Sequence, residues 1–295
     1  MTELVLETRS RTFAAVASDY LELSKARIVL MVLVTTAAGY LVAASSLDPG
    51  MLFHLLAGTA LVAGGTNALN QWWERGLDGR MARTRNRPLP SGRMTSRVAL
   101  AFSVGISVAG IAYLAILVNP LASLLSFATL ASYLFVYTPM KTRSTLCTLV
   151  GAAPGAVPPM IGYAAATGVI DARSWSLFAL MFAWQLPHFL ALSWIYREDY
   201  ARGGFRMLSV EDESGAAVGR QAVAWSLALL VASTVPVWLG LAGLAYALAA
   251  GVAGFALLGS AARFAFRMSA GTARTLFMGS NVYLIVVMVA LVIGA

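Results

Sequence analysis

Asn70, Glu74 and Asp78 are spaced four residues apart near the end of a long apolar segment. In a continuous α-helix this spacing puts the three side chains along one face, because each step of four residues turns by only about 40°. Amide and carboxylate oxygens suit a hard cation such as Mg²⁺, which keeps several waters and is usually completed by substrate phosphates. The three residues are therefore candidate catalytic residues and metal ligands.

Four arginines follow these acids directly, at Arg80, Arg83, Arg85 and Arg87. Guanidinium groups bind phosphate oxygens through forked hydrogen bonds, so acids for a metal and arginines for an anion together predict a diphosphate site. The alternative interpretation is that the arginines only set membrane orientation and that the acids are their surface partners. For the acids this alternative is the weaker one, because charges at membrane depth are costly.

A second polar cluster, WIYREDYARGGFRML, runs from Trp194 to Leu208 and follows a later apolar segment. Glu198 and Asp199 close that segment much as the first acids close the earlier one. If both segments end on the same side of a membrane, their acids could hold one metal diphosphate between them. The alternative is that Arg197 and Arg202 simply pair with these acids.

The elements that must position these residues are membrane helices. Apolar residues make up 59% of the chain and charged residues only 12%, far from the composition of a soluble domain. Each of the seven charge-free runs exceeds the roughly 18 residues that span a bilayer. The runs are Ile28–Leu47, Pro49–Trp73, Val98–Met140, Ser144–Ile170, Ser174–Tyr196, Gln221–Ala262 and Thr275–Ala295.

Two of the runs are about twice the length of one span. One has a break at Asn119 and Pro120, and the other has a break between Pro236 and Gly243. The sequence thus predicts an all-α polytopic membrane protein with nine transmembrane helices in one domain, residues 28–295. Residues 1–27 are expected to form a cytoplasmic N-terminal segment that is not a cleaved signal peptide, because it carries acids and has no apolar core.

Basic residues predict the orientation of the nine helices. With this helix count, 20 of the 21 Lys and Arg lie on the N-terminal side and only Arg173 lies opposite. We therefore expect a cytoplasmic N-terminus and a periplasmic C-terminus. The net charge of +8 is explained by topology, so no nucleic-acid partner is expected. The single cysteine, Cys147, excludes an intramolecular disulfide and a Cys-based metal cluster.

The first cluster resembles the signature of a known family. Its pattern is N-x3-E-x3-D followed by M-x-R-T-x-x-R-P, here Asn70, Glu74, Asp78, Met81, Arg83, Thr84, Arg87 and Pro88. It is similar to the first signature of the UbiA superfamily of membrane prenyltransferases, and its middle Glu is typical of the branch that farnesylates heme. Further matching segments, which together with it cover most of residues 20–290, are SKARI, VYTPMKTRS, GAAPGAVPPMIGYAA, WQLPHFLALSWIYREDY and GGFRML.

The resemblance implies a helical bundle with a central cavity and a Mg²⁺-dependent reaction in the bacterial-type inner membrane. Farnesyl diphosphate would be ionised there and its C1 joined to a vinyl group of heme B, with water added to give heme O. A heme A synthase would act downstream, for terminal oxidase biogenesis. Asp199 carries over as a catalytic residue and metal ligand, whereas Gly203 stands where the wider superfamily often has a second Asp.

Three further residues are candidates for binding the substrates. His188 lies in mid-span in the segment QLPHF, and Pro187 before it loosens the helix so that a side chain can enter a cavity. His188 could bind heme iron or orient a propionate, or it could be a core histidine bonded to a neighbouring helix. Lys141 and Arg143 could reach the diphosphate or a propionate, although both could equally be orientation signals.

Alternative functions remain at this stage. Within the enzymes, the alternative acceptor is the aromatic ring of a quinone precursor. A transporter also has many helices and broken spans, but acids at helix ends on one side suit a one-sided active site better than alternating access. A purely structural subunit gives no reason for two acidic clusters with flanking arginines.

Overall fold

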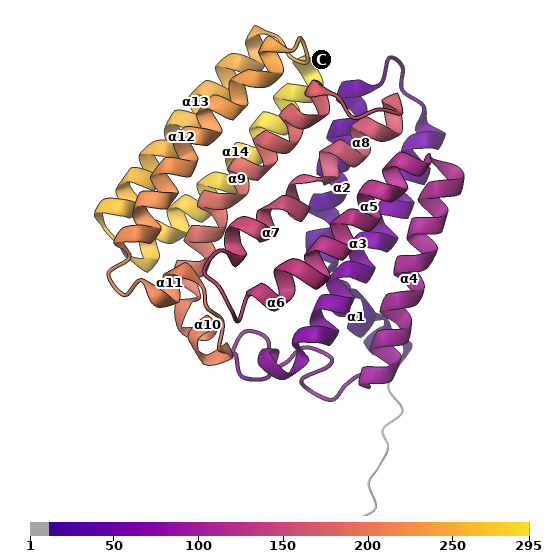
Figure 1. Ribbon diagram of the computed structural model, residues 1–295, viewed down its shortest axis with the longest axis vertical. Coiled ribbons are helices and arrows are strands. Elements are labelled where there is room, and N and C mark those ends of the chain that lie inside the picture. The colour runs from indigo at the N-terminus through magenta and orange to yellow at the C-terminus, as the bar shows by residue number, and fades with distance from the viewer. Residues whose placement is uncertain (1–11, 295) are drawn as a thin grey trace, which may run out of the picture.

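The structure is a computed structural model, and it describes residues 12–294. The described chain is helical, and Figure 1 shows the helices as one bundle. In the first half of the chain the helices are α1 (Phe13–Leu23), α2 (Ala26–Ala43), α3 (Pro49–Asp78), α4 (Ser96–Leu117), α5 (Pro120–Ala131), the π-helix η1 (Ser132–Tyr137) and α6 (Thr138–Met140). In the second half they are α7 (Cys147–Ala156), α8 (Pro158–Thr167), α9 (Ala172–Ile195), α10 (Arg197–Gly203), α11 (Leu208–Glu211), α12 (Ala216–Trp238), α13 (Leu244–Phe266) and α14 (Ala270–Gly294).

Nine spans that are long and apolar enough to cross a membrane occur within residues 12–294, which confirms the predicted number of transmembrane helices. The first predicted break lies where expected: Asn119 caps α5 by accepting a hydrogen bond from the Ala122 N–H, and Pro120 begins the helix. The second break lies within the predicted stretch from Pro236 to Gly243, because α12 ends at Trp238 and α13 begins at Leu244. Pro236 is still inside α12, and the chain turns at Gly240, which has a positive φ of 67°.

Two spans are less regular than the sequence indicates. The span Cys147–Thr167 is divided at Val157 into α7 and α8, because Pro158 and Pro159 begin a new helix there. The span Pro120–Met140 passes through the π-helix η1 before it ends. Short π-helices of this kind are frequent at functional sites, and this one is separated from Lys141 only by the three residues of α6.

Helices in the bundle pack closely where glycines face a neighbouring backbone. Gly39 of α2 and Gly162 of α8 show this most clearly: a Cβ at Gly39 would lie 2.0 Å from the Pro159 carbonyl oxygen, and one at Gly162 would lie 2.0 Å from that of Thr36. Small residues let helix backbones approach in a membrane, where lipid offers no hydrophobic driving force for association. Helices α12, α13 and α14 pack with α9 and form the side of the bundle away from α3, α4 and α5 (Figure 1).

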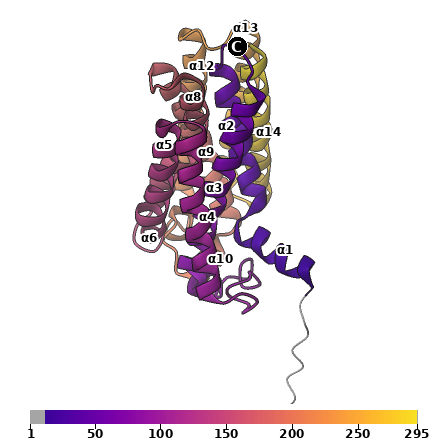
Figure 2. The same ribbon diagram turned by 90° about the vertical axis from the view of Figure 1, so that its right-hand side faces the viewer.

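Three short helices lie outside the spans, at the end of the bundle opposite the C-terminus: α1, α10 and α11 (Figure 1). Helix α1 falls within the predicted N-terminal segment, residues 1–27, for which no helix was predicted; residues 1–11 of that segment lie outside the described part of the chain. Figure 2 shows α1 projecting from the side of the bundle. Helix α10 is separate from α9, because Tyr196 interrupts the helix. Glu198 and Asp199 therefore do not close the membrane helix itself.

Candidate active site

A pocket of about 150 Å³ lies where α3 ends, beside α6 and the segment after α10. It combines charged and amide side chains with an apolar and aromatic wall. The polar lining residues are Lys25, Asn70, Glu74, Asp78, Arg83, Arg87 and Lys141. The others are Ile28, Met81, Tyr137, Tyr200, Phe205 and Met207.

Helix α3 presents the three predicted oxygen donors to this pocket. It continues without interruption to Asp78, so the spacing of four residues keeps Asn70, Glu74 and Asp78 on one face. All three are almost fully buried, at 0%, 5% and 1% exposure, respectively. The helix thus carries two carboxylates and an amide into a space that water reaches poorly.

A cation holds each of these oxygen donors. Lys25 Nζ donates to Asn70 Oδ1 over 3.0 Å. The Lys141 ammonium lies 2.8 Å from Glu74 Oε1, and Arg87 donates to Asp78 Oδ2 over 2.7 Å. Buried charges are costly unless they are paired, so this alternation accounts for how α3 can bury its acids.

The same alternation makes the pocket suitable for a ligand that carries both signs of charge. A cation bound to the α3 oxygens would draw them away from Lys25, Lys141 and Arg87, and those three residues would need an anion in exchange. A metal ion bound to a diphosphate supplies both charges at once. Within residues 12–294 no group of three or more His, Cys, Asp or Glu side chains is placed to hold a metal ion.

The π-helix shapes the wall opposite α3. Thr138 follows it and accepts a hydrogen bond from Asn70 Nδ2 over 3.2 Å, while its own hydroxyl donates to the Tyr133 carbonyl over 2.9 Å. The Tyr137 ring lies 4.6 Å from the Lys141 ammonium, as a cation–π pair. The extra residue in this turn therefore directs Tyr137 to the pocket and Thr138 to Asn70.

Arg83 connects the loop after α3 to the segment around α10. Its guanidinium lies 4.9 Å from the Tyr196 ring centroid and 5.8 Å from that of Tyr200. Arg83 is largely exposed and, like Tyr200, lines the pocket. The two polar clusters that the sequence singled out are thus in contact, although about 115 residues separate them along the chain.

Asp199 is brought next to the first cluster, but it does not line the pocket. Its Oδ1 accepts a hydrogen bond from the Ala82 N–H over 3.0 Å and another from Arg202 over 2.6 Å. The hydrogen bond from Arg202 lowers the pKa of Asp199, although burial opposes this shift. Asp199 instead lines a second pocket that contains Glu198 and Arg202. In this structure Asp199 supports the loop after α3, through the backbone of Ala82 and Arg83.

The structure also separates two other predicted residues from the pocket. Arg143 is exposed beyond α6 and is not among the lining residues, in contrast to Lys141. His188 is partly buried within α9, where its Nδ1 lies 2.9 Å from Ser280 Oγ of α14. The rings of Trp184 and Phe277 lie 5.1 and 4.6 Å from its ring centroid.

Sequence reasoning did not identify Lys25 or the aromatic residues of the pocket. Lys25 was counted only as an orientation signal within the segment SKARI. Its signal in the sequence is weak, because a lysine at the start of a membrane helix is common. Tyr137 and Phe205 lie in segments that match the family, but aromatic residues near a membrane surface are also common, so type and position alone did not single them out.

Nine membrane spans within residues 12–294, with a pocket of acids and cations at one end, define a class of membrane protein, and comparisons with known proteins identify that class. The model of the UbiA prenyltransferase family matches residues 32–285. The chain therefore belongs to the UbiA prenyltransferase family, and it is a multi-pass membrane enzyme that transfers prenyl groups.

Two similar relatives carry the same name within this family. A protein of Solibacter usitatus (strain Ellin6076) is 45% identical over 276 residues, covering 90% of this chain and 94% of the relative. A protein of Anaeromyxobacter sp. (strain Fw109-5) is 46% identical over 280 residues, covering 95% and 94%. Both relatives are named protoheme IX farnesyltransferase.

Solved structures confirm the fold. The structure described for digeranylgeranylglyceryl phosphate synthase has a TM-score of 0.78 at 16% identity, covering 94% of this chain and 98% of that one. A UbiA homologue from Archaeoglobus fulgidus, solved with GPP and Mg²⁺, has a TM-score of 0.62 at 12% identity, covering 92% and 99%. At these identities the similarity concerns the fold alone.

Proposed function

We propose that this protein transfers the farnesyl group of farnesyl diphosphate to a vinyl group of heme B, with addition of water, to give heme O and diphosphate. The observation that carries the proposal is the pocket at the end of α3, where Asn70, Glu74 and Asp78 each contact a cation. The choice of heme as acceptor rests on the relatives, which are 45–46% identical over nearly their whole length.

The pocket would bind the diphosphate end of the prenyl substrate. Lys25, Arg87 and Lys141 already lie against oxygens of α3, and each can transfer its hydrogen bonds to phosphate oxygens. Arg83 adds a guanidinium at the open side, and Arg143 could approach only from outside the present lining. Fixed cations of this kind stabilise negative charge that develops on a leaving diphosphate, without having to reorganise.

Mg²⁺ fits the chemistry of the donors on α3, which are all oxygens. Asn70, Glu74 and Asp78 would hold it, and Asp199 remains a proposed ligand through its Oδ2 atom. When bound, Mg²⁺ neutralises charge on the diphosphate and favours its departure. The UbiA homologue from Archaeoglobus fulgidus is described as bound to GPP and Mg²⁺, which supports the same requirement here.

The reaction breaks the bond between C1 and oxygen, and the electron pair leaves with the diphosphate. The allylic cation left behind takes the π electrons of the heme vinyl group to form the new carbon–carbon bond. Water then captures the resulting cation beside the porphyrin and releases a proton. The rings of Tyr137, Tyr200 and Phe205 line the pocket and would stabilise positive charge while restricting access of bulk water to the allylic cation.

His188 is the proposed contact to heme. The Ser280 hydroxyl donates to the Phe277 carbonyl over 2.7 Å, so it must accept from the Nδ1–H of His188. This arrangement puts the proton on Nδ1 and leaves Nε2 as a lone-pair donor. A second hydrogen bond that fixes the tautomer is typical of metal-binding histidines, which supports a role as a ligand of heme iron.

We also propose that the protein lies in the cytoplasmic membrane with its N-terminus in the cytoplasm and its C-terminus outside. The distribution of basic residues supports this orientation. A reporter inserted near Gly92 should be detected on the cytoplasmic side, and one fused after Ala295 on the periplasmic side. Detection of both reporters on one side would contradict it.

The activity is tested by incubating the purified protein with heme B, farnesyl diphosphate and Mg²⁺, followed by mass analysis of the heme. The expected product carries the mass of a farnesyl group plus water. A parallel incubation with an aromatic quinone precursor tests the alternative acceptor. Alkylation of that precursor alone would show that the protein is a prenyltransferase of a different substrate class.

A further inference from the structure

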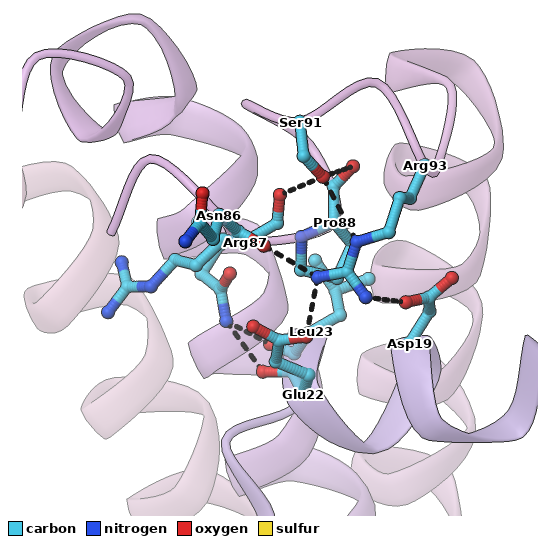
Figure 3. Close-up of polar contacts among 9 residues, drawn as sticks. Asp19, Glu22, Leu23, Asn86, Arg87, Pro88, Ser91 and Arg93 are labelled. Atoms are coloured by element: carbon cyan, nitrogen blue, oxygen red, sulfur yellow. Dashed lines mark hydrogen bonds and ion pairs between the residues drawn. The ribbon is translucent and has the colours of Figure 1, made fainter. Parts of the chain in front are cut away.

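The loop after α3 is fastened to α1 by one arginine (Figure 3). Arg93 forms ion pairs with the carboxylates of Asp19 and Glu22, and its Nη2 also donates to the Asn86 carbonyl over 2.6 Å. The Asp19 side chain is only 2% exposed, whereas that of Arg93 is 35% exposed. A buried carboxylate requires such a partner, so the contact defines where α1 lies relative to the loop.

A second contact joins α1 to α3. Gln71 Nε2 donates to the carbonyls of Glu22 and Leu23, over 2.9 and 2.8 Å, at the C-terminal end of α1. These carbonyls belong to the last turn of the helix, where intrahelical partners are missing. Gln71 is itself buried, at 1% exposure, and directly follows Asn70 on α3. We refer to the contacts of Arg93 and Gln71 with α1 as the α1 clasp.

The α1 clasp holds the chain two residues before Lys25. Lys25 joins α1 to α2 and is the one non-glycine residue with a positive φ, 52°, in residues 12–294. A left-handed backbone is unfavourable for lysine, so the flanking helices must enforce it. This turn directs the Lys25 side chain into the pocket, where its Nζ meets Asn70 Oδ1.

We propose that Arg93 and Gln71 are positioning residues for the diphosphate site, which act by holding α1 so that Lys25 enters the pocket. Neither residue lines the pocket, so any effect on its ligand must pass through another residue. Arg93 also fixes the carbonyl of Asn86, which directly precedes Arg87, and so constrains a second cation of the site. The inference rests on the proposed function only in that the pocket binds a diphosphate.

Binding of inorganic pyrophosphate with Mg²⁺ to the purified full-length protein tests the proposal independently of the heme acceptor and the prenyl length. The double variant Arg93→Met with Asp19→Asn removes the Arg93 contacts of the clasp and also neutralises the buried carboxylate of Asp19. We expect its dissociation constant to rise about ten-fold, because a charge-assisted contact to the ligand is lost. Lys25→Met should raise it by a similar factor.

The decisive measurement combines the two changes. If the clasp acts through Lys25, adding Lys25→Met to the double variant should cause little further loss, whereas independent effects would multiply. Gln71→Met tests the second contact without altering charge, and Arg93→Lys keeps a charge near Asp19 if the double variant does not fold. Arg97→Met is the matched control, since it removes an exposed arginine four residues after Arg93, and the variant should bind pyrophosphate as the wild type does.

The possible outcomes separate the two proposals. Pyrophosphate that does not bind to the wild type would overturn the diphosphate site itself. Wild-type binding together with unchanged affinity in the clasp variants would overturn the positioning role alone. Multiplicative losses on combination with Lys25→Met would also overturn it, because the clasp would then act without Lys25.

Discussion

The end of α3 and the short helix α10 both carry acids beside arginines at the same end of the bundle, yet their carboxylates meet different surroundings. Glu74 and Asp78 face a pocket and are paired with cations that also line it. Asp199 bonds to the backbone of the loop after α3 and to Arg202, and it lies outside that pocket.

The difference arises from helix continuity. Helix α3 extends unbroken to Asp78, so all its polar residues remain on one face. Helix α9 ends at Ile195, and Tyr196 separates it from α10, so Asp199 has a new direction. A similar pattern of acids in the sequence can therefore face a substrate in one place and support a loop in another.

The largest effect is expected at the α3 end. Asp78→Asn and Glu74→Gln should each reduce kcat by roughly 10²–10³-fold. Each variant removes a carboxylate that faces the metal diphosphate, and it leaves the paired cation, Arg87 or Lys141, without its counter-charge. Prenyl transfer to heme under saturating substrates is the measurement, and chelation of divalent ions should abolish wild-type turnover.

Glu211→Gln is the matched control for these two changes. Glu211 pairs with Arg206 at an exposed position outside the pocket, so the same loss of a carboxylate should leave turnover within about two-fold of wild type. Full activity of Asp78→Asn in the presence of chelator would contradict the assignment of the α3 end.

A second comparison is between the α3 end, where the diphosphate is proposed to bind, and α9, where His188 is proposed to contact heme. His188→Ala should weaken heme binding by roughly 10–100-fold, as is typical of losing a metal contact, yet leave pyrophosphate binding unchanged. Titration of each ligand separately against the folded variant is the measurement. If His188 is only a core histidine bonded to Ser280, thermal stability should fall and both ligands should be affected together.

The nine spans were predictable because charge-free length and the asymmetry of basic residues both report on the membrane, which acts on every helix alike. The α3 donors were predictable because a continuous helix converts spacing into direction. The role of Lys25 could not be predicted from the sequence, because its place in the pocket depends on a left-handed turn and on the α1 clasp. The direction of Asp199 also depended on a helix break at Tyr196, where the sequence has neither Gly nor Pro.

Asp199→Asn tests the role of the buried acid on α10. We expect about a ten-fold loss of kcat/KM, smaller than for Asp78→Asn, because the amide oxygen can still accept from the Ala82 N–H while the charge-assisted bond to Arg202 is weakened. Initial rates at low farnesyl diphosphate concentration measure it. A weaker dependence on Mg²⁺ in this variant would support the proposed ligand role of Oδ2, whereas an unchanged dependence on Mg²⁺ would limit Asp199 to supporting the loop after α3.

The smallest effect is expected at the neighbouring acid. Glu198 is exposed and lies next to Arg202 in the second pocket, where water screens its charge. Exposed ion pairs contribute at most about 1 kcal/mol, so Glu198→Gln should change kcat/KM by less than about two-fold. Glu198→Gln is measured beside Asp199→Asn under the same conditions. The pair of variants distinguishes an effect of the Asp199 carboxylate, which is oriented by hydrogen bonds, from an effect of negative charge anywhere on α10. Equal losses in the two variants would mean that the charge of the segment matters and not the hydrogen bond from Ala82, since that bond is made by Asp199 alone.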